Sequence, residues 1–225
     1  MVKSGSRTSA EPRVSPFRLA AHLTSVFVIY NGIFWTALSV VMPEPPAESV
    51  AWLKGAAKVK RLALPVSILV GITGVSGAFV AGNDAGRAFN TFPKMGDTWV
   101  PADIFSMKPL LRNFFENTSI AQLDHRVLGT TTLAAIGGLW FSTQKLDLHP
   151  AIRSLIGSIV GMAALQRLAL PVSILVGITV PVSLGTAHQD GVLTLLSLML
   201  LLNHTVRRPS VSLLKTLPPV VKIVT

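Results

Sequence analysis

Long blocks of apolar residues without charges are the feature that most constrains this chain. The first block runs from Leu19 to Met42 and the second from Leu62 to Ala81, and each is close to the roughly 20 residues that an α-helix needs to cross a bilayer. A third block covers residues 120–142 after a polar start, and residues 154–203 are apolar over a length that suits two crossings. The sequence therefore predicts an all-α integral membrane protein of about five transmembrane helices.

Arg167 supplies the main alternative to five crossings. It lies inside the fourth predicted helix, where a charged side chain costs roughly 2.5–3.5 kcal/mol on insertion scales. If this helix does not insert, four crossings remain.

Composition supports a membrane protein and narrows its chemistry. Hydrophobic residues make up 50% of the 225 residues and charged residues only 13%, whereas soluble domains carry about 25% charged residues. The net charge of +10 is spread among the loops between the apolar blocks and forms no single patch, so we expect no nucleic-acid partner. The chain has no cysteine, which excludes disulfides and cysteine-held iron-sulfur clusters.

Basic residues in the loops predict an orientation. They concentrate in the short loops 43–61 and 143–153 and in the tail 207–225, which the positive-inside rule assigns to the matrix or cytoplasmic side. Residues 1–16 are rich in serine and arginine, and we interpret them as a basic loop rather than as a mitochondrial transit peptide.

Three of the five histidines lie about one and a half turns inside a predicted helix, and they are His22, His125 and His188. Their helices are the first, third and fifth, which all start on the same side, so the three imidazoles fall at one depth near one face. An ionisable group inside a membrane span must be paired, hydrated or metal-bound. For each histidine alone, a hydrogen bond to a nearby carbonyl is the simpler interpretation. Three histidines at one depth favour a metal cofactor. The other two histidines, His149 and His204, are assigned no role.

Small residues near these histidines suit a flat macrocycle. Gly185 and Gly191 lie three positions on either side of His188, and Gly129 lies four positions after His125. Helix bundles hold heme through side chains on facing helices. The pattern predicts a heme site.

Two arginines occupy positions where the acidic groups of a heme would emerge. Arg18 precedes His22 by one helical turn, and Arg126 directly follows His125. Guanidinium groups bind carboxylates with paired hydrogen bonds, so we expect both arginines to contact heme propionates. For Arg167, a side chain that reaches the membrane surface or pairs with a propionate is the less favoured interpretation.

The loop of about residues 82–119 is rich in turn-forming residues, among them Asp84, Gly86, Asn90 and Pro93. Asp and Asn cap local turns, and Gly and Asn tolerate left-handed backbone. We expect an ordered loop that covers the edge of the heme.

Four segments resemble the heme A synthase family in its mitochondrial and alphaproteobacterial form, and they occur in the family's order. They are VSPFRLAAHL at 14–23, VSGAFVAGNDAGRAFNTFPKMGDTWVP at 75–101, FFENTSIAQLDHRVLGTTTLAAIG at 114–137, and VPVSLGTAHQDGVLTLLSLMLLLNHTVRRPS at 180–210. The resemblance implies an eight-helix protein of two four-helix halves. It would oxidise the C8 methyl of heme O to the formyl group of heme A, with heme b as a bound cofactor.

The resemblance also implies roles for the three histidines. His125 and His188 match the two axial ligands of heme b, whereas His22 matches a histidine of the N-terminal half, where heme O reacts. The chain then divides into a basic loop, the last helix of the N-terminal half, a heme b bundle and a basic tail. These are residues 1–16, 17–42, 62–206 (helices about 62–82, 119–142, 152–176 and 183–205) and 207–225.

Partners and location follow from the same resemblance. It implies heme O as substrate, an electron-transfer partner such as a ferredoxin, heme O synthase, membrane lipid and a homo-oligomer. The implied location is the mitochondrial inner membrane, or the plasma membrane in a bacterium.

The chain departs from the family pattern in two ways. The family's first three helices are absent, so we expect this chain alone to lack heme A synthase activity, because His22 has no opposing helix. The segment RLALPVSILVGIT occurs at 61–73 and again at 167–179, which indicates a recent duplication, a splicing error or an assembly artefact. Two other functions fit the histidines: a b-type electron-transfer subunit without substrate chemistry, and a proton-relaying transporter.

Overall fold

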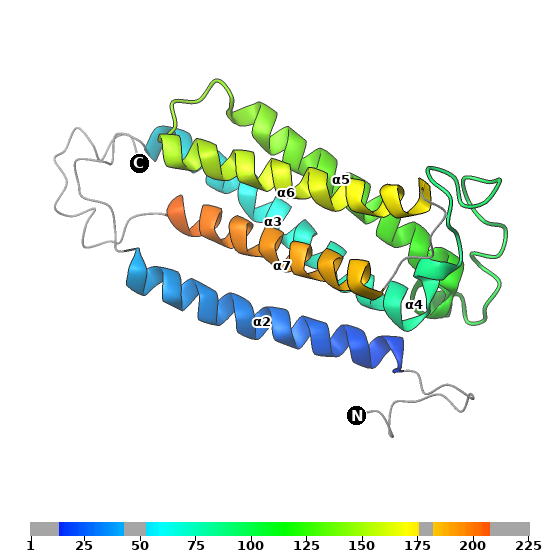
Figure 1. The fold of residues 1–225 in the computed structure, drawn as a ribbon. Helices are drawn as coiled ribbons and strands as arrows, with labels where there is room; N and C mark the ends of the chain where they lie inside the picture. Colours follow the sequence, from blue (N-terminus) through cyan, green and yellow to red (C-terminus); the bar gives the residue numbers. More distant parts are fainter. Residues whose placement is uncertain (1–13, 43–52, 176–181, 208–225) are drawn as a thin grey trace, which may run out of the picture.

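The computed structural model describes residues 14–42, 53–175 and 182–207. These residues form an all-α structure, and Met95 and Thr98 form an isolated bridge, which confirms the predicted fold class (Figure 1). The elements are α2 (Pro16–Val41), α3 (Leu53–Gly82), η2 (Ala85–Arg87), η3 (Leu110–Arg112), α4 (Asn113–Glu116), α5 (Thr118–Thr143), α6 (Pro150–Leu175) and α7 (Val182–Thr205).

Four long helices form a bundle around a common apolar core. α3 packs against α5 and α7, and α6 packs against the same two helices, so α5 and α7 lie diagonally across the bundle. Core residues recur three or four positions apart, so one stripe of each helix faces inward. They include Val59, Ala63, Val66 and Val70 of α3, Ile136 and Leu139 of α5, Ile152, Ile156 and Ile159 of α6, and Leu195, Met199 and Leu202 of α7.

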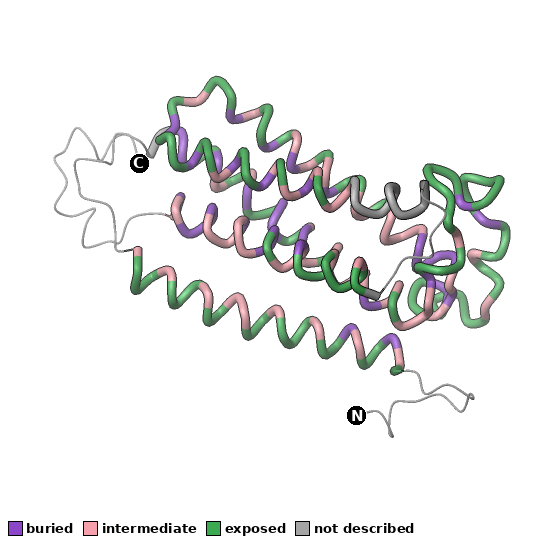
Figure 2. Tube along the Cα trace, in the orientation of Figure 1, coloured by how far each residue is buried: buried purple, intermediate pink, exposed green. Residues whose placement is uncertain are grey.

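The remaining long helix, α2, lies outside this bundle along α3 and α7 (Figure 1). Its buried residues are Pro16 and Ala20, both in its first two turns. Figure 2 shows how little of α2 is covered, and Val28 and Ile33 are 66% and 65% exposed. Such a surface suits contact with lipid or other apolar helices rather than water. The predicted arrangement of a four-helix bundle plus one helix is confirmed.

Two helices of the described part of the chain are long and apolar enough to cross a membrane, by length and composition. They are Pro16–Val41 and Gly55–Gly82. The other three long helices carry charged side chains within their first three turns, among them Arg153, Asp124 and Asp190. Crossings by α5, α6 and α7 therefore stay a prediction.

Helix α3 begins nine residues before the predicted start at 62. A Cβ atom on Gly55 would lie 2.6 Å from Leu148 Cδ2 and 2.7 Å from the Asp147 carbonyl oxygen, so the missing side chain lets the first turn pack on the α5–α6 loop. Ala56 and Val59 of the same turns are buried. These tertiary contacts extend the helix beyond the apolar block, which the apolar pattern alone could not reveal.

Hydrogen bonds between side chains join the helices of the bundle to one another and to α2. In lipid such bonds hold helices together because no water competes for the donors. They join Asn203 Nδ2 to Ser67 Oγ at 2.6 Å, Thr73 Oγ1 to Thr132 Oγ1 at 2.8 Å, and Tyr30 Oη to Ser197 Oγ at 2.6 Å.

The contact between α2 and α3 gives a test of this packing. A Cβ atom on Gly82 would lie 2.6 Å from Pro16 Cα, and backbone cannot yield as a side chain can. We expect Gly82→Ala to destabilise the detergent-solubilised protein by about 1–3 kcal/mol, as overpacking does. Gly71→Ala on the same helix is the control, because its Cβ would meet no atom within 4 Å. Equal melting temperatures of the two variants would contradict the described α2–α3 contact.

Candidate functional site

His125 of α5 and His188 of α7 face each other across the diagonal of the bundle. Their ring centroids are 6.3 Å apart, and the ring planes are inclined by 80°. A metal–imidazole bond is about 2.0–2.1 Å long, so two rings on opposite sides of one ion would have centroids about 6 Å apart. The spacing fits two axial ligands of a single metal.

The hydrogen bonding of the two imidazoles differs. Nδ1 of His125 lies 2.7 Å from Ser76 Oγ on α3. Nδ1 of His188 is buried and has no hydrogen-bond partner among the described residues. An unpaired buried polar atom is costly, so His188 is the group in this pair that a bound ligand would satisfy.

A cavity of about 100 Å³ includes both histidines in its lining. Its walls are largely apolar, with Val70, Leu133 and Val192 among them, and Gly129 contributes open space because its Cβ would meet nothing within 4 Å. A planar macrocycle needs more room than this cavity offers.

Gln166 of α6 fills the neighbouring space. A Cβ atom on Gly191 would overlap the Gln166 amide nitrogen, and Gln166 Oε1 is buried without a hydrogen-bond partner in the described part of the chain. Gly191 therefore accommodates Gln166 in this structure. Gly185 of α7 is exposed and borders open space.

Two guanidinium groups line the same cavity. Arg126 donates from Nη2 to the Phe89 carbonyl at 3.0 Å and from Nη1 to the Lys94 carbonyl at 3.1 Å. The Arg167 guanidinium lies over the Phe92 ring, 4.3 Å from its centroid. Both cations thus sit where the cavity meets the loop between α3 and α5, and carbonyls do not neutralise their charge.

The segment between α3 and α5 is ordered by many hydrogen bonds, as its turn residues predict. Asn117 caps α5 by accepting from the Ser119 and Ile120 amides, and its Nδ2 donates to the Asp103 carbonyl at 2.7 Å. Gln122 Nε2 donates to the Phe89 carbonyl at 3.1 Å. In the same segment, the hydrogen bond and charge of Glu116 raise the pKa of the neighbouring Arg112.

His22 and Arg18 lie at the start of α2, which is at the same end of the bundle as the starts of α5 and α7 (Figure 1). Both side chains are exposed and neither lines the cavity between His125 and His188. The structure therefore groups two of the three predicted histidines and leaves His22 apart from them.

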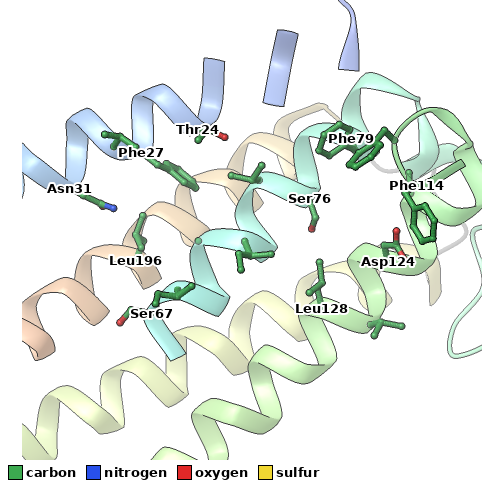
Figure 3. Close-up of a pocket in the computed structure, with 18 of the residues that line it drawn as sticks. Thr24, Phe27, Asn31, Ser67, Ser76, Phe79, Phe114, Asp124, Leu128 and Leu196 are labelled. Carbon is green, nitrogen blue, oxygen red and sulfur yellow. The ribbon is translucent and has the colours of Figure 1, made fainter. Parts of the chain in front are cut away.

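A second, larger cavity lies between α2 and the bundle. Its volume is about 960 Å³, and its lining is mainly apolar. The polar members are Thr24, Asn31, Ser67, Ser76 and Asp124 (Figure 3). Ser76 lines this larger cavity and also contacts His125, which lines the smaller one. The turn of α3 that carries Ser76 therefore separates the two cavities.

Sequence reasoning missed Ser76 and Gln166, and it gave a propionate contact of Arg167 less weight than a disturbed helix. Ser76 lies 49 residues from His125 along the chain, and no local pattern links them. The unusual place of an arginine within a predicted span was the one available signal for Arg167.

Comparison with known proteins decides the family. Residues 1–200 match the COX15-CtaA family of cytochrome oxidase assembly proteins. The chain belongs to this family. The resemblance found in the sequence is thereby confirmed, and with it the class of all-α membrane protein.

Several curated relatives are similar over nearly the whole chain. Heme A synthase COX15 of Arabidopsis thaliana is 72% identical over 226 residues, which cover 99% of this chain and 49% of the relative. Heme A synthase COX15 of Mus musculus is 41% identical, with 92% and 50% covered. A heme A synthase-mitochondrial ferredoxin fusion protein of Schizosaccharomyces pombe is 33% identical, with 88% and 37% covered. The chain spans about half the length of the first two, and no solved structure matches it.

The Asn117 cap offers a test of the loop. We expect Asn117→Ala to cost about 1 kcal/mol of stability, as lost N-caps do, and to speed proteolysis of residues 83–112. Asn117→Asp keeps the acceptor for the α5 amides but loses the donor to the Asp103 carbonyl, so its cleavage rate should lie between those of the wild type and the Ala variant. Asn90→Ala, at an exposed loop position, is the control. Equal cleavage rates in all four proteins would show that the cap does not order the loop.

Proposed function

We propose that His125 and His188 are the two axial ligands of one heme b. The observation that carries this proposal is their spacing, 6.3 Å between ring centroids across the bundle diagonal. The buried and unpartnered Nδ1 of His188 and the open space beside Gly129 support it. Gln166 would have to leave the space between α6 and α7, which its unpaired Oε1 makes less costly.

Arg126 and Arg167 would bind the two carboxylates of this heme. Both line the cavity, and two cations beside one cavity favour an anionic ligand. Arg126 is already oriented by the carbonyls of Phe89 and Lys94. Arg167 thus joins Arg126 and takes the place of Arg18, the other arginine that the sequence predicts at the propionates. Arg18 and His22, which lie apart, would instead contact heme O.

The reaction that we propose is oxidation of the C8 methyl of heme O to the formyl group of heme A. The names of the relatives from Arabidopsis thaliana and Mus musculus, both heme A synthases, support it. A bound heme supplies the redox chemistry, whereas the protein supplies binding and orientation. In this chain His125 and His188 would fix the cofactor, and His22 would hold the substrate iron.

We further propose a ferredoxin as electron-transfer partner and the mitochondrial inner membrane as location. The Schizosaccharomyces pombe relative is named as a fusion with a mitochondrial ferredoxin, which supports both. Contact with heme O synthase and homo-oligomer formation stay predictions of the family resemblance.

A b-type electron-transfer subunit without substrate chemistry is the second candidate. A heme held by the two histidines His125 and His188 would supply electron transfer, as hemes do in cytochromes. This geometry would serve either function, so heme product analysis must separate them.

The heme site can be tested by spectroscopy. We expect the purified protein, loaded with heme, to show a reduced low-spin b-type spectrum, because two imidazoles make a strong ligand field. His125→Ala and His188→Ala should each lose it. His149→Ala is the control, since His149 is exposed at the start of α6 and outside the cavity. An unchanged spectrum in both cavity variants would exclude the ligand assignment.

The reaction can be tested with a chimera. Residues 1–225 replace the matching part of the Arabidopsis thaliana relative, to which they are 72% identical. In cells that make heme O but lack heme A synthase, extracted heme should include heme A with the chimera, and heme O without heme A with its His125→Ala form. A chimera that binds heme b but makes no heme A would favour the electron-transfer candidate.

A further inference from the structure

The hydrogen bonds of Ser76 bear on which nitrogen of His125 carries a proton. Ser76 Oγ donates to the Thr73 carbonyl at 2.7 Å, within its own helix. Figure 3 shows the Ser76 side chain projecting from α3 toward α5, the helix that carries His125. Oγ also lies 2.7 Å from His125 Nδ1.

A serine hydroxyl has a single proton. When the Ser76 hydroxyl donates that proton to the Thr73 carbonyl, Oγ is the acceptor toward His125, and Nδ1 of His125 is the donor. This arrangement favours the Nδ1-protonated tautomer.

This tautomer leaves the lone pair on Nε2, at the opposite edge of the ring. In a neutral imidazole one nitrogen donates and the other accepts or binds a metal. A hydrogen bond from the distal N–H of a ligating histidine fixes the ring and raises its basicity. Ser76 provides such a bond from a helix that carries neither proposed ligand.

We propose that Ser76 is a positioning residue that holds His125 as the Nδ1–H tautomer and directs its Nε2 lone pair toward heme iron. This inference rests on the proposed heme site. His188 has no matching partner at Nδ1 among the described residues. The two axial ligands would therefore be unequal, with His125 the stronger donor.

Ser76→Ala removes the acceptor and leaves the His125 ring in place. A less basic ligand stabilises ferric iron less, so the midpoint potential of the bound heme should shift to a more positive value. Heme affinity should fall about 10–100-fold, as is typical when an outer-shell partner of a metal ligand is lost. The measurements are potentiometric titration, low-temperature electron paramagnetic resonance and heme dissociation, all on the purified full chain loaded with heme.

Two further variants separate this role from simple packing. Ser76→Thr keeps the hydroxyl and should restore the wild-type potential and heme retention. Ser39→Ala is the matched control, because Ser39 Oγ also contacts a histidine, 3.1 Å from Nε2 of His204, outside the heme cavity. It should leave the potential unchanged.

The outcomes distinguish this inference from the proposed function. If Ser76→Ala retains heme with the wild-type potential and resonance, the positioning role is wrong while the heme site stands. If Ser76→Ala loses heme and Ser76→Thr loses it equally, the hydroxyl is not what matters and the role is also wrong. If the unmodified chain shows no b-type spectrum, the heme site itself fails, and the role of Ser76 fails with it.

Discussion

The pairing of polar groups inside an apolar bundle is the constraint on which the rest of the structure depends. Lipid offers no partner for a side-chain donor or acceptor, so each polar group within the helices must find one inside the protein. Ser67, Thr73 and Tyr30 do so through bonds to neighbouring helices. His188 Nδ1 and Gln166 Oε1 do not, among the described residues, and the Gln166 side chain packs beside Gly191, one turn after His188. Asn31 Oδ1 and Gln122 Oε1 also lack a partner among the described residues, but only His188 and Gln166 line the cavity that contains His125, which makes this cavity the candidate site.

Two histidines with direct hydrogen bonds show how structural and ligand roles can be told apart. His204 is fully buried, and both of its nitrogens are engaged: Arg207 Nη1 lies 2.7 Å from Nδ1, and Ser39 Oγ lies 3.1 Å from Nε2. Because a guanidinium can only donate, His204 Nδ1 accepts, and the neutral ring donates from Nε2 to Ser39. Arg207 also donates to the Met42 carbonyl at 2.9 Å, so this group joins the ends of α2 and α7. His125 has partners described for Nδ1 only. A histidine whose two ring nitrogens are both hydrogen-bonded holds helices together, whereas one with a free lone pair beside a cavity can bind a metal.

The sequence predicts helices far better than it predicts which side chains meet. Apolar blocks locate the helices because the membrane dictates their length, and the shared depth of His125 and His188 follows from the alternation of helix direction. The nine extra residues of α3 depend on contacts of Gly55 with the α5–α6 loop, which no periodic pattern encodes. Likewise, a small residue near a histidine predicts open space without saying what fills it. Gly129 does border open space, but Gly191 borders Gln166, a residue from another helix.

The repeated segment shows that position within the bundle, and not local sequence, gives an arginine its role. Both copies begin with an arginine followed by the same residues. Arg61 is the ninth residue of α3, whereas Arg167 is the eighteenth of α6, and both helices run from the same end of the bundle. The difference of nine positions corresponds to about 13 Å at 1.5 Å per residue. Arg61 is therefore exposed near the start of its helix, while Arg167 reaches the cavity of His125 and His188. An arginine that looks like a defect in a span, when only hydropathy is considered, lies beside Arg126 at the place where an anionic cofactor would need a second cation.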